Sequence, residues 1–178
     1  GKKCCSYFLD VTKKSQIQKM VSDILSDIGS IDILVNNAGI LTPTSLEEID
    51  EETWDNHFEV NTKGVLLMCQ SVLPHMREKN SGRIINIASI AGRQGSPTQG
   101  HYASTKSAVI TLTRVLAQEV GEAGITVNAI CPGIILTEMG KNNLGSEKEI
   151  EHWSNVAALK RLGAVSYTHL TLPTNVAV

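Results

Sequence analysis

The stretch RIINIASIAGRQGSPTQGHYASTK, residues 83–106, organises the rest of this sequence. It begins with a short apolar run typical of a buried parallel strand, and that run ends just before Ser89. Tyr102 and Lys106 are four residues apart at the start of an apolar-periodic segment, so on a helix their side chains share one face. Ligand crevices of open parallel sheets form at the carboxyl ends of strands. The stretch therefore predicts a hydroxyl, a phenol and an ammonium at such a crevice.

Strand-like and helix-like segments alternate along the rest of the chain. Helical periodicity is strong before Gly29, in residues 15–28, and again from Asp50 to Asn80. The short apolar runs that are typical of strands occupy residues 4–11, 31–35, 83–88 and 125–130. This alternation predicts an α/β fold with a doubly wound, Rossmann-like parallel sheet.

Asn61 interrupts the long helical pattern and has two interpretations. In the first it is an exposed residue that costs the helix about 0.5 kcal/mol. In the second the helix bends locally and turns this polar side chain into the site. The pattern alone favours the first interpretation.

Composition excludes several classes of function. At 178 residues and 42% hydrophobic content the chain is long enough for one domain with a core. A net charge of −2 without a basic cluster argues against a nucleic-acid surface. The four cysteines lack metal-ligand spacing, which predicts free thiols in a reducing compartment and no metal. With no apolar run of membrane-spanning length, we expect a cytoplasmic protein that does not act at a membrane.

Five motifs follow one another in a characteristic order. They are NNAG at 36–39, VNTKG at 60–64, NIAS at 86–89, YASTK at 102–106 and PGIILTEM at 132–139. In this order they resemble the signatures of the main branch of the short-chain dehydrogenase/reductase family, and the resemblance covers residues 4 to about 165. It implies hydride transfer between NAD or NADP and a secondary alcohol or ketone.

The resemblance also implies roles for individual residues. The implied catalytic set is Asn61, Ser89, Tyr102 and Lys106. The implied cofactor-binding residues are Asp10, Val11, Asn37, Ala38, Gly39, Tyr102, Lys106, Pro132, Gly133, Ile135 and Thr137. On physical grounds, an ammonium about 4 Å from the Tyr102 phenol, at an effective dielectric near 20, would lower the phenol pKa by roughly three units. Asp10 is explained equally well as a strand-end turn residue.

The histidines and the variable segment carry weaker predictions. The five histidines are His57, His75, His101, His152 and His169, and none has metal-ligand spacing. We expect all of them to be surface or partly packed residues, with only His101 a candidate for the substrate pocket. The segment 138–162 resembles the family's variable substrate lid, with a helix near 148–159.

Both ends of the chain depart from the family pattern. The glycine-rich turn that holds the pyrophosphate is absent, and with it a strand-helix-strand-helix unit and the residue that selects NAD or NADP. The last family strand is missing too, and the tail from about Ser166 fits no family element. We therefore interpret residues 1–165 as a partial NAD(P)-binding domain and 166–178 as a sequencing or translation artefact.

The expected function follows from this interpretation. The complete protein is expected to be an oxidoreductase acting on a small alcohol or ketone, resembling a 3-oxoacyl reductase or a sugar or polyol dehydrogenase. The resemblance implies a homotetramer or homodimer. Two alternatives stay open: a non-catalytic dinucleotide-binding protein of the same fold, and a fragment that is inactive as written.

Overall fold

The computed structural model describes residues 4–165, which form parts of two compact units, one up to Cys131 and one from Pro132. The first unit contains α1 (Lys14–Ile28), β1 (Ile33–Asn36), η1 (Leu46–Glu48), α2 (Glu51–Phe58), η2 (Glu59–Lys63), α3 (Gly64–Lys79), β2 (Gly82–Ile87), α4 (Ala91–Gln94), α5 (Gly100–Val120), η3 (Gly121–Ala123) and β3 (Ile125–Ile130). The second contains α6 (Glu138–Leu144) and α7 (Glu147–Val156). The predicted tail and His169 lie outside the described residues.

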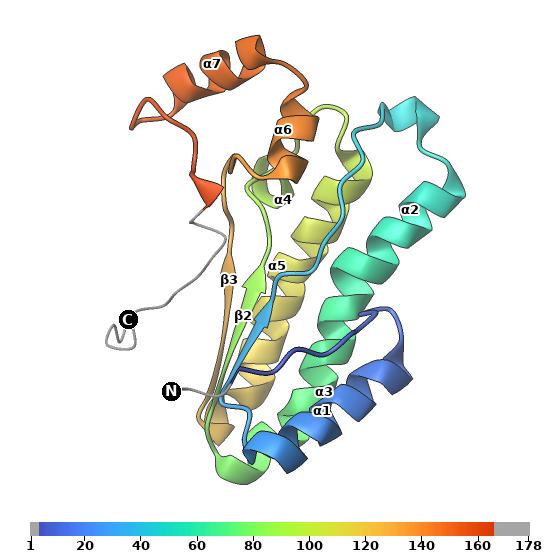
Figure 1. Cartoon of the computed structure of the whole chain (residues 1–178), viewed down its shortest axis with the longest axis vertical. Coiled ribbons are helices and arrows are strands. Elements are labelled where there is room, and N and C mark those ends of the chain that lie inside the picture. Colours follow the sequence, from blue (N-terminus) through green and yellow to red (C-terminus); the bar gives the residue numbers. More distant parts are fainter. Residues whose placement is uncertain (1–3, 166–178) are drawn as a thin grey trace. The chain divides into compact units, whose positions relative to one another are not determined.

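The described part of the first unit holds a three-stranded parallel sheet in the order β1-β2-β3. Ile85 of β2 lies opposite Val35 of β1 and Asn128 of β3. Helices α3 and α5 pack on one face of this sheet, and α1 packs against α3 (Figure 1). The predicted α/β fold with a parallel sheet is therefore confirmed. Since all three strands point the same way, their carboxyl ends share one edge.

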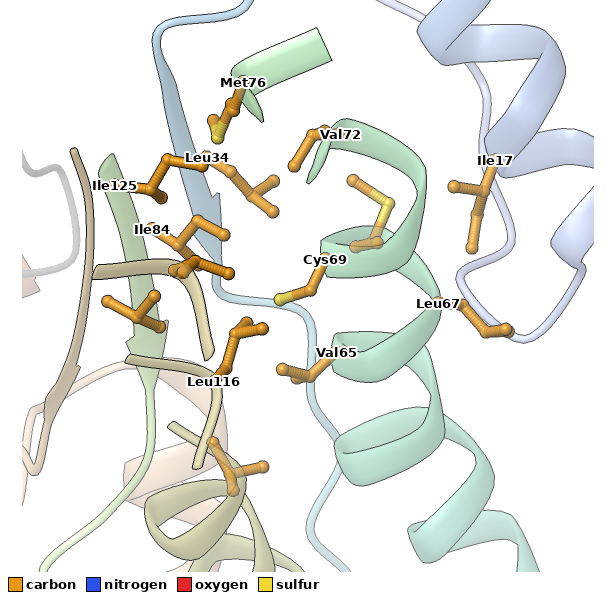
Figure 2. Close-up of a cluster of buried hydrophobic side chains, with 14 of the residues drawn as sticks. Ile17, Leu34, Val65, Leu67, Cys69, Val72, Met76, Ile84, Leu116 and Ile125 are labelled. Carbon is orange, nitrogen blue, oxygen red and sulfur yellow. The ribbon is translucent and has the colours of Figure 1, made fainter. Parts of the chain in front are cut away.

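Apolar side chains from the strands and helices meet in one core. Ile84 of β2 and Met76 of α3 are fully buried, and Ile17 brings α1 to the same cluster (Figure 2). Gly82 permits this packing, because a Cβ there would lie 2.5 Å from the sulfur of Met76. The helix-covered face of the sheet is thus well packed, whereas Ile33 and Val35 are 50% and 40% exposed.

The strand predicted at residues 4–11 is wrong. These described residues are irregular, and Phe8 is 98% exposed. A strand needs a ladder partner for its backbone groups, and within the described range no strand pairs with this segment. The following helix is confirmed as α1, which begins at Lys14 without a side-chain cap.

The long helical segment before β2 is interrupted as its sequence indicated. Helix α2 runs directly into η2, a single turn of π-helix that contains Asn61, and η2 runs directly into α3. A π turn accommodates one extra residue and is frequent at functional sites. Asn61 is fully buried, so the interpretation as an exposed asparagine is wrong and the one with an inward polar side chain is confirmed.

The second unit, taken by itself, is held by two capped helices and a short bridge. The Thr137 hydroxyl accepts a hydrogen bond from Gly140 N at the start of α6, and Ser146 caps α7 in the same way. Ile135 and Gly163 form a parallel bridge, in which Leu136 N donates to Gly163 O at 2.9 Å. Helix α7 confirms the helix expected near 148–159.

Candidate active site

Ser89 and the first two turns of α5 meet beyond the carboxyl end of β2. Ser89 lies two residues after the strand, where its Oγ accepts a hydrogen bond from Ala91 N at 3.1 Å. This contact holds the hydroxyl at the start of α4. The Ser89 side chain is close enough to Tyr102 to lower the pKa of its phenol. The structure therefore brings the hydroxyl and the phenol predicted to act together into the same site.

Lys106 is buried beneath this pair. It is 4% exposed, its Nζ donates to Ile87 O at 2.8 Å, and the same Nζ lies 5.7 Å from the centre of the Tyr102 ring. Burial disfavours the charged ammonium and lowers the pKa of Lys106 from 10.5 to about 8. The ammonium is thus within reach of the phenol but directed at a strand-end carbonyl.

The pKa of the Tyr102 phenol is shifted in the opposite direction to the one expected. Burial raises the pKa of the Tyr102 phenol, and the Ser89 side chain opposes this rise without cancelling it. The lowering expected from Lys106 is not among the effects on this phenol, and the ammonium is itself desolvated. At neutral pH the phenol consequently keeps its proton.

Asn61 ties the loop after β1 to α5. Its Oδ1 accepts from Ile40 N at 2.8 Å, and its Nδ2 donates to Ile40 O at 3.0 Å and to Thr105 Oγ1 at 3.2 Å. Thr105 in turn donates to Tyr102 O at 2.7 Å. Every polar atom of the buried amide is therefore used. Asn61 fixes the loop and the tyrosine turn relative to each other.

The loop after β1 passes close to these groups. A Cβ placed on Gly39 would lie 3.3 Å from Asn61 Oδ1 and 3.4 Å from Lys106 Nζ. Asn37 and Ala38 are exposed directly after β1, at the sheet edge where Ser89 also lies. The structure thus brings Asn37, Ala38 and Gly39 to the same edge as the catalytic candidates, and their cofactor role stays a prediction.

The other predicted cofactor residues have local roles of their own. Asp10 Oδ1 accepts from Thr12 N and Thr12 Oγ1 at 2.9 and 2.8 Å, and these hydrogen bonds lower the Asp10 pKa. A Cβ on Gly64 would lie 3.0 Å from Val11 Cγ2, so Val11 packs closely against this glycine. Asp10 therefore makes the turn contact that was its alternative explanation. The remaining four residues belong to the second unit: Pro132, Gly133, Ile135 and Thr137.

Sequence reasoning missed several buried polar residues around the site. Asn36 Nδ2 donates to Asn86 Oδ1 at 2.8 Å, and Asn86 Nδ2 donates to Thr113 Oγ1 at 2.9 Å, which links β1, β2 and α5. His57 and His101 are 2% and 0% exposed, so the expectation that these two lie at the surface or are partly packed is wrong.

A periodic signal for these residues was available. Buried positions recur every three or four residues along both helices, and the polar members lie on the same stripes as the apolar ones. One stripe comprises His57, Asn61, Gly64, Met68, Val72 and Met76, and the other His101, Thr105, Val109, Thr113, Leu116 and Val120. Extending the apolar periodicity towards the amino end of each helix would have found both histidines.

Metal-binding clusters and membrane-spanning helices can be assessed for residues 4–165. In that range the structure contains no cluster of three or more histidine, cysteine, aspartate or glutamate side chains arranged to hold a metal ion. No described helix combines the length and apolar character that crossing a membrane requires.

Comparisons with known proteins agree with the geometry. A sequence model described as short chain dehydrogenase matches residues 1–148. The 3-oxoacyl-[acyl-carrier-protein] reductase FabG of Staphylococcus epidermidis is 40% identical over 154 residues, which cover 86% of this chain and 62% of that protein. FabG of Thermotoga maritima is 42% identical over 133 residues, covering 75% and 54%. This chain thus spans less than two thirds of the length of these relatives.

Solved structures agree as well. ElxO with NADP bound superposes with a TM-score of 0.84 at 33% identity, covering 97% of this chain and 72% of ElxO. A gluconate 5-dehydrogenase from Burkholderia cenocepacia, in complex with NADP and tartrate, gives 0.84 at 31% identity, covering 88% and 61%.

Proposed function

Because this chain belongs to the short-chain dehydrogenase family, we propose that the protein containing it transfers a hydride between a nicotinamide dinucleotide and a secondary alcohol or ketone. The observation that carries the proposal is that the Ser89 hydroxyl, the Tyr102 phenol and the buried Lys106 ammonium gather beyond the carboxyl end of β2. Asn61 supports this group through Thr105. These four residues are the proposed catalytic set.

The chemistry of the site supports proton transfer to a carbonyl oxygen. The nicotinamide supplies the hydride when bound. Ser89 would donate a hydrogen bond to the substrate oxygen, and Tyr102 would give that oxygen its proton as the alkoxide forms. A phenol whose pKa is raised keeps its proton at neutral pH, so we propose reduction as the favoured direction. Lys106, with a pKa of about 8, is suited to stabilise the phenolate that remains.

The loop after β1 is compatible with a dinucleotide. A side chain on Gly39 would crowd Asn61 and Lys106. Because glycine has none, a ligand can approach the backbone closely here. Asn37, Ala38, Gly39 and Lys106 would line the nicotinamide side of that ligand. We propose NADP as the first cofactor to test, since ElxO and the gluconate dehydrogenase both carry it. The other proposed contacts are Asp10, Val11, Pro132, Gly133, Ile135 and Thr137.

Two substrate classes follow from the relatives. The FabG reductases favour a 3-oxoacyl thioester, and the gluconate dehydrogenase favours a sugar acid or polyol. The first class has the stronger sequence support, because the FabG reductases are 40% and 42% identical to this chain and the gluconate dehydrogenase 31%. We expect the full-length protein to consume NADPH with a 3-oxoacyl thioester faster than with a keto sugar acid. Binding of the dinucleotide without turnover on either would instead support a non-catalytic dinucleotide-binding protein.

We further propose that the complete protein is a cytoplasmic homodimer or homotetramer. An apolar groove of about 1020 Å³ lies along the outer side of η2, α3 and α5, lined in part by Phe58, Leu66, Leu112 and Val115. Leu66 and Val115 are 37% and 46% exposed, which is unusual for side chains of this size and supports burial by a second copy. Light scattering tests this: Val115→Glu should shift the full-length protein towards the monomer. Cell fractionation tests the location.

A further inference from the structure

Two buried histidines lie against each other beside the tyrosine turn. His57 comes from the last turn of α2 and His101 from the first turn of α5. Their ring centres are 4.0 Å apart with an edge-on angle of 78°. The proposed proton transfer uses neither ring. A buried pair of titratable rings, one residue away from Tyr102, calls for a physical explanation.

The hydrogen bonds of His57 define its tautomer. Its Nδ1 lies 2.7 Å from Thr53 O, which only accepts, so Nδ1 carries the proton. Its Nε2 accepts from Thr42 N at 3.3 Å, so Nε2 carries none. A second proton on this ring would set two N–H groups against each other and break the contact with Thr42. The neutral ring is therefore the one that holds the loop after β1.

His101 has the opposite environment. Within residues 4–165, neither ring nitrogen makes a hydrogen bond of normal geometry. Burial lowers the pKa of His101, the neighbouring His57 lowers it further, and the backbone of Thr42 opposes this.

The charged groups around His101 do not favour a positive charge on its ring. The nearby acids of α2, Glu51, Glu52 and Asp55, are exposed. None of them acts on His101, whereas His57 does. On its own helix the buried cation is Lys106, which donates to Ile87 O. No described carboxylate thus stabilises an imidazolium at this position, and only the backbone of Thr42 acts in its favour.

The pair stands where three segments join. His57 holds the loop after β1 through Thr42, and Thr44 N of the same loop donates to Thr98 O, just before α5, at 2.8 Å. His101 belongs to the α5 turn that carries Tyr102. The packing of one ring on the other is therefore a direct side-chain link from α2 to that turn.

We propose that His57 and His101 form a positioning pair that holds the Tyr102 turn in place, and that acid releases this turn by protonating His101. His101 has a folded-state pKa below its unfolded value, so the unfolded state binds more protons as the pH falls. Its contribution to stability is present above the unfolded value of about 6.5 and is lost as the pH falls through that value towards the folded one. Neither histidine is a catalytic residue in this proposal.

Hydrogen exchange and NMR on the unmodified full-length protein test the pair without any assay of turnover. After correction for intrinsic rates, we expect amide protection in residues 100–106 to fall several-fold between pH 7.5 and 5.5, because the unfolded state takes up more protons as the pH falls. Nitrogen chemical shifts should show His57 as the Nδ1–H tautomer at pH 7.5. A His101 ring that titrates at or above 6.5, or protection that does not change with pH, would overturn the proposal.

A variant and a matched control sharpen the test. His101→Leu keeps a similar volume without a titratable group, and it should reduce the change in protection to less than about twofold. His75→Gln is the control, because His75 is half-buried on α3, away from the pair, and its ring accepts from Ile31 N. It should behave as the unmodified protein does. An equal loss of pH dependence in both variants would contradict the proposal.

The pH profile of turnover provides a separate test of the pair, and this test rests on the proposed function. His101→Leu should flatten the acid side of the kcat profile while leaving kcat near pH 7.5 within about threefold, an effect that a purely structural residue would not have. If the unmodified protein binds the dinucleotide but has no turnover, the proposed function fails and the exchange result still decides the role of the pair. A kcat profile that keeps the same acid side in His101→Leu would overturn the positioning role.

Discussion

Residues 4–12 and residues 82–106 have the same sequence pattern, an apolar run followed by a polar turn and a helix, yet only the second forms a strand. Strand β2 lies between β1 and β3 and has a ladder on both sides. Residues 4–10 pair with no strand within the described range, and Phe8 is almost fully exposed. An apolar run therefore specifies a strand only together with the partners that satisfy its backbone.

The largest expected difference between the two regions is chemical. Tyr102→Phe removes the proposed proton donor, and kcat of the full-length protein should fall about 10³-fold, as expected for loss of a general acid. Tyr7→Phe is the matched control in the other region, because Tyr7 OH donates only to the exposed Asp27, at 3.2 Å. Steady-state kinetics should show kcat unchanged within about twofold for Tyr7→Phe. Similar losses in both variants would contradict the assigned site.

Packing gives the next difference. Ile84→Ala empties a fully buried position on the central strand and should lower the free energy of unfolding of this chain by about 3.5 kcal/mol. Denaturant unfolding at neutral pH measures it. A loss below about 1 kcal/mol would mean that β2 is not the centre of the core.

Lys106 should make stability depend on pH in the alkaline range. Its folded pKa of about 8 lies below the unfolded value of 10.5, so the unfolded state binds more protons between these values and stability rises with pH through this window. The gain is on the order of 3 kcal/mol, from 2.5 pKa units. Because burial also raises the pKa of Cys69 to about 11, which opposes this gain, the Lys106 contribution is the change in stability between pH 7.5 and 10.5 in the unmodified chain minus the change in Lys106→Met, both from denaturant unfolding. Lys19→Met, at an exposed position on α1, should keep the gain.

The smallest effect is expected in the amino-terminal region. Phe8→Ala should change the free energy of unfolding of this chain by less than about 0.5 kcal/mol, because the side chain is 98% exposed. The same denaturant measurement compares it directly with Ile84→Ala. A cost above 1.5 kcal/mol would show that Phe8 is buried in solution and would remove the contrast between the two regions.

The site was more predictable from sequence than its surroundings. Ser89, Tyr102 and Lys106 are recognisable because a strand end and a helical spacing of four determine their placement. The fold class followed from the alternation of strands and helices for the same reason. The tuning of Tyr102 was not predictable, because it depends on burial and on the direction of the Lys106 ammonium, which points at Ile87 O.

The burial of polar residues on the buried helix stripes was also not predicted from the sequence. His57 and His101 were taken for surface or partly packed residues because histidine is usually polar in character, although both continue the period of an apolar stripe. Their ring contact joins segments that are 44 residues apart in the chain, and local patterns carry no such information. Asn61 is the intermediate case, since its break in the pattern allowed a local bend but favoured an exposed side chain.

The π turn at Glu59–Lys63 allows the site to change without a change in the packing of the helices on either side. A π turn is one residue inserted into an α-helix, with the helix on either side keeping its rotational phase. Deletion of one codon in this turn would therefore leave α2 and α3 facing the core as before, while Asn61 would no longer reach Ile40 and Thr105. The protein could lose this polar contact in a single genetic event without losing its scaffold.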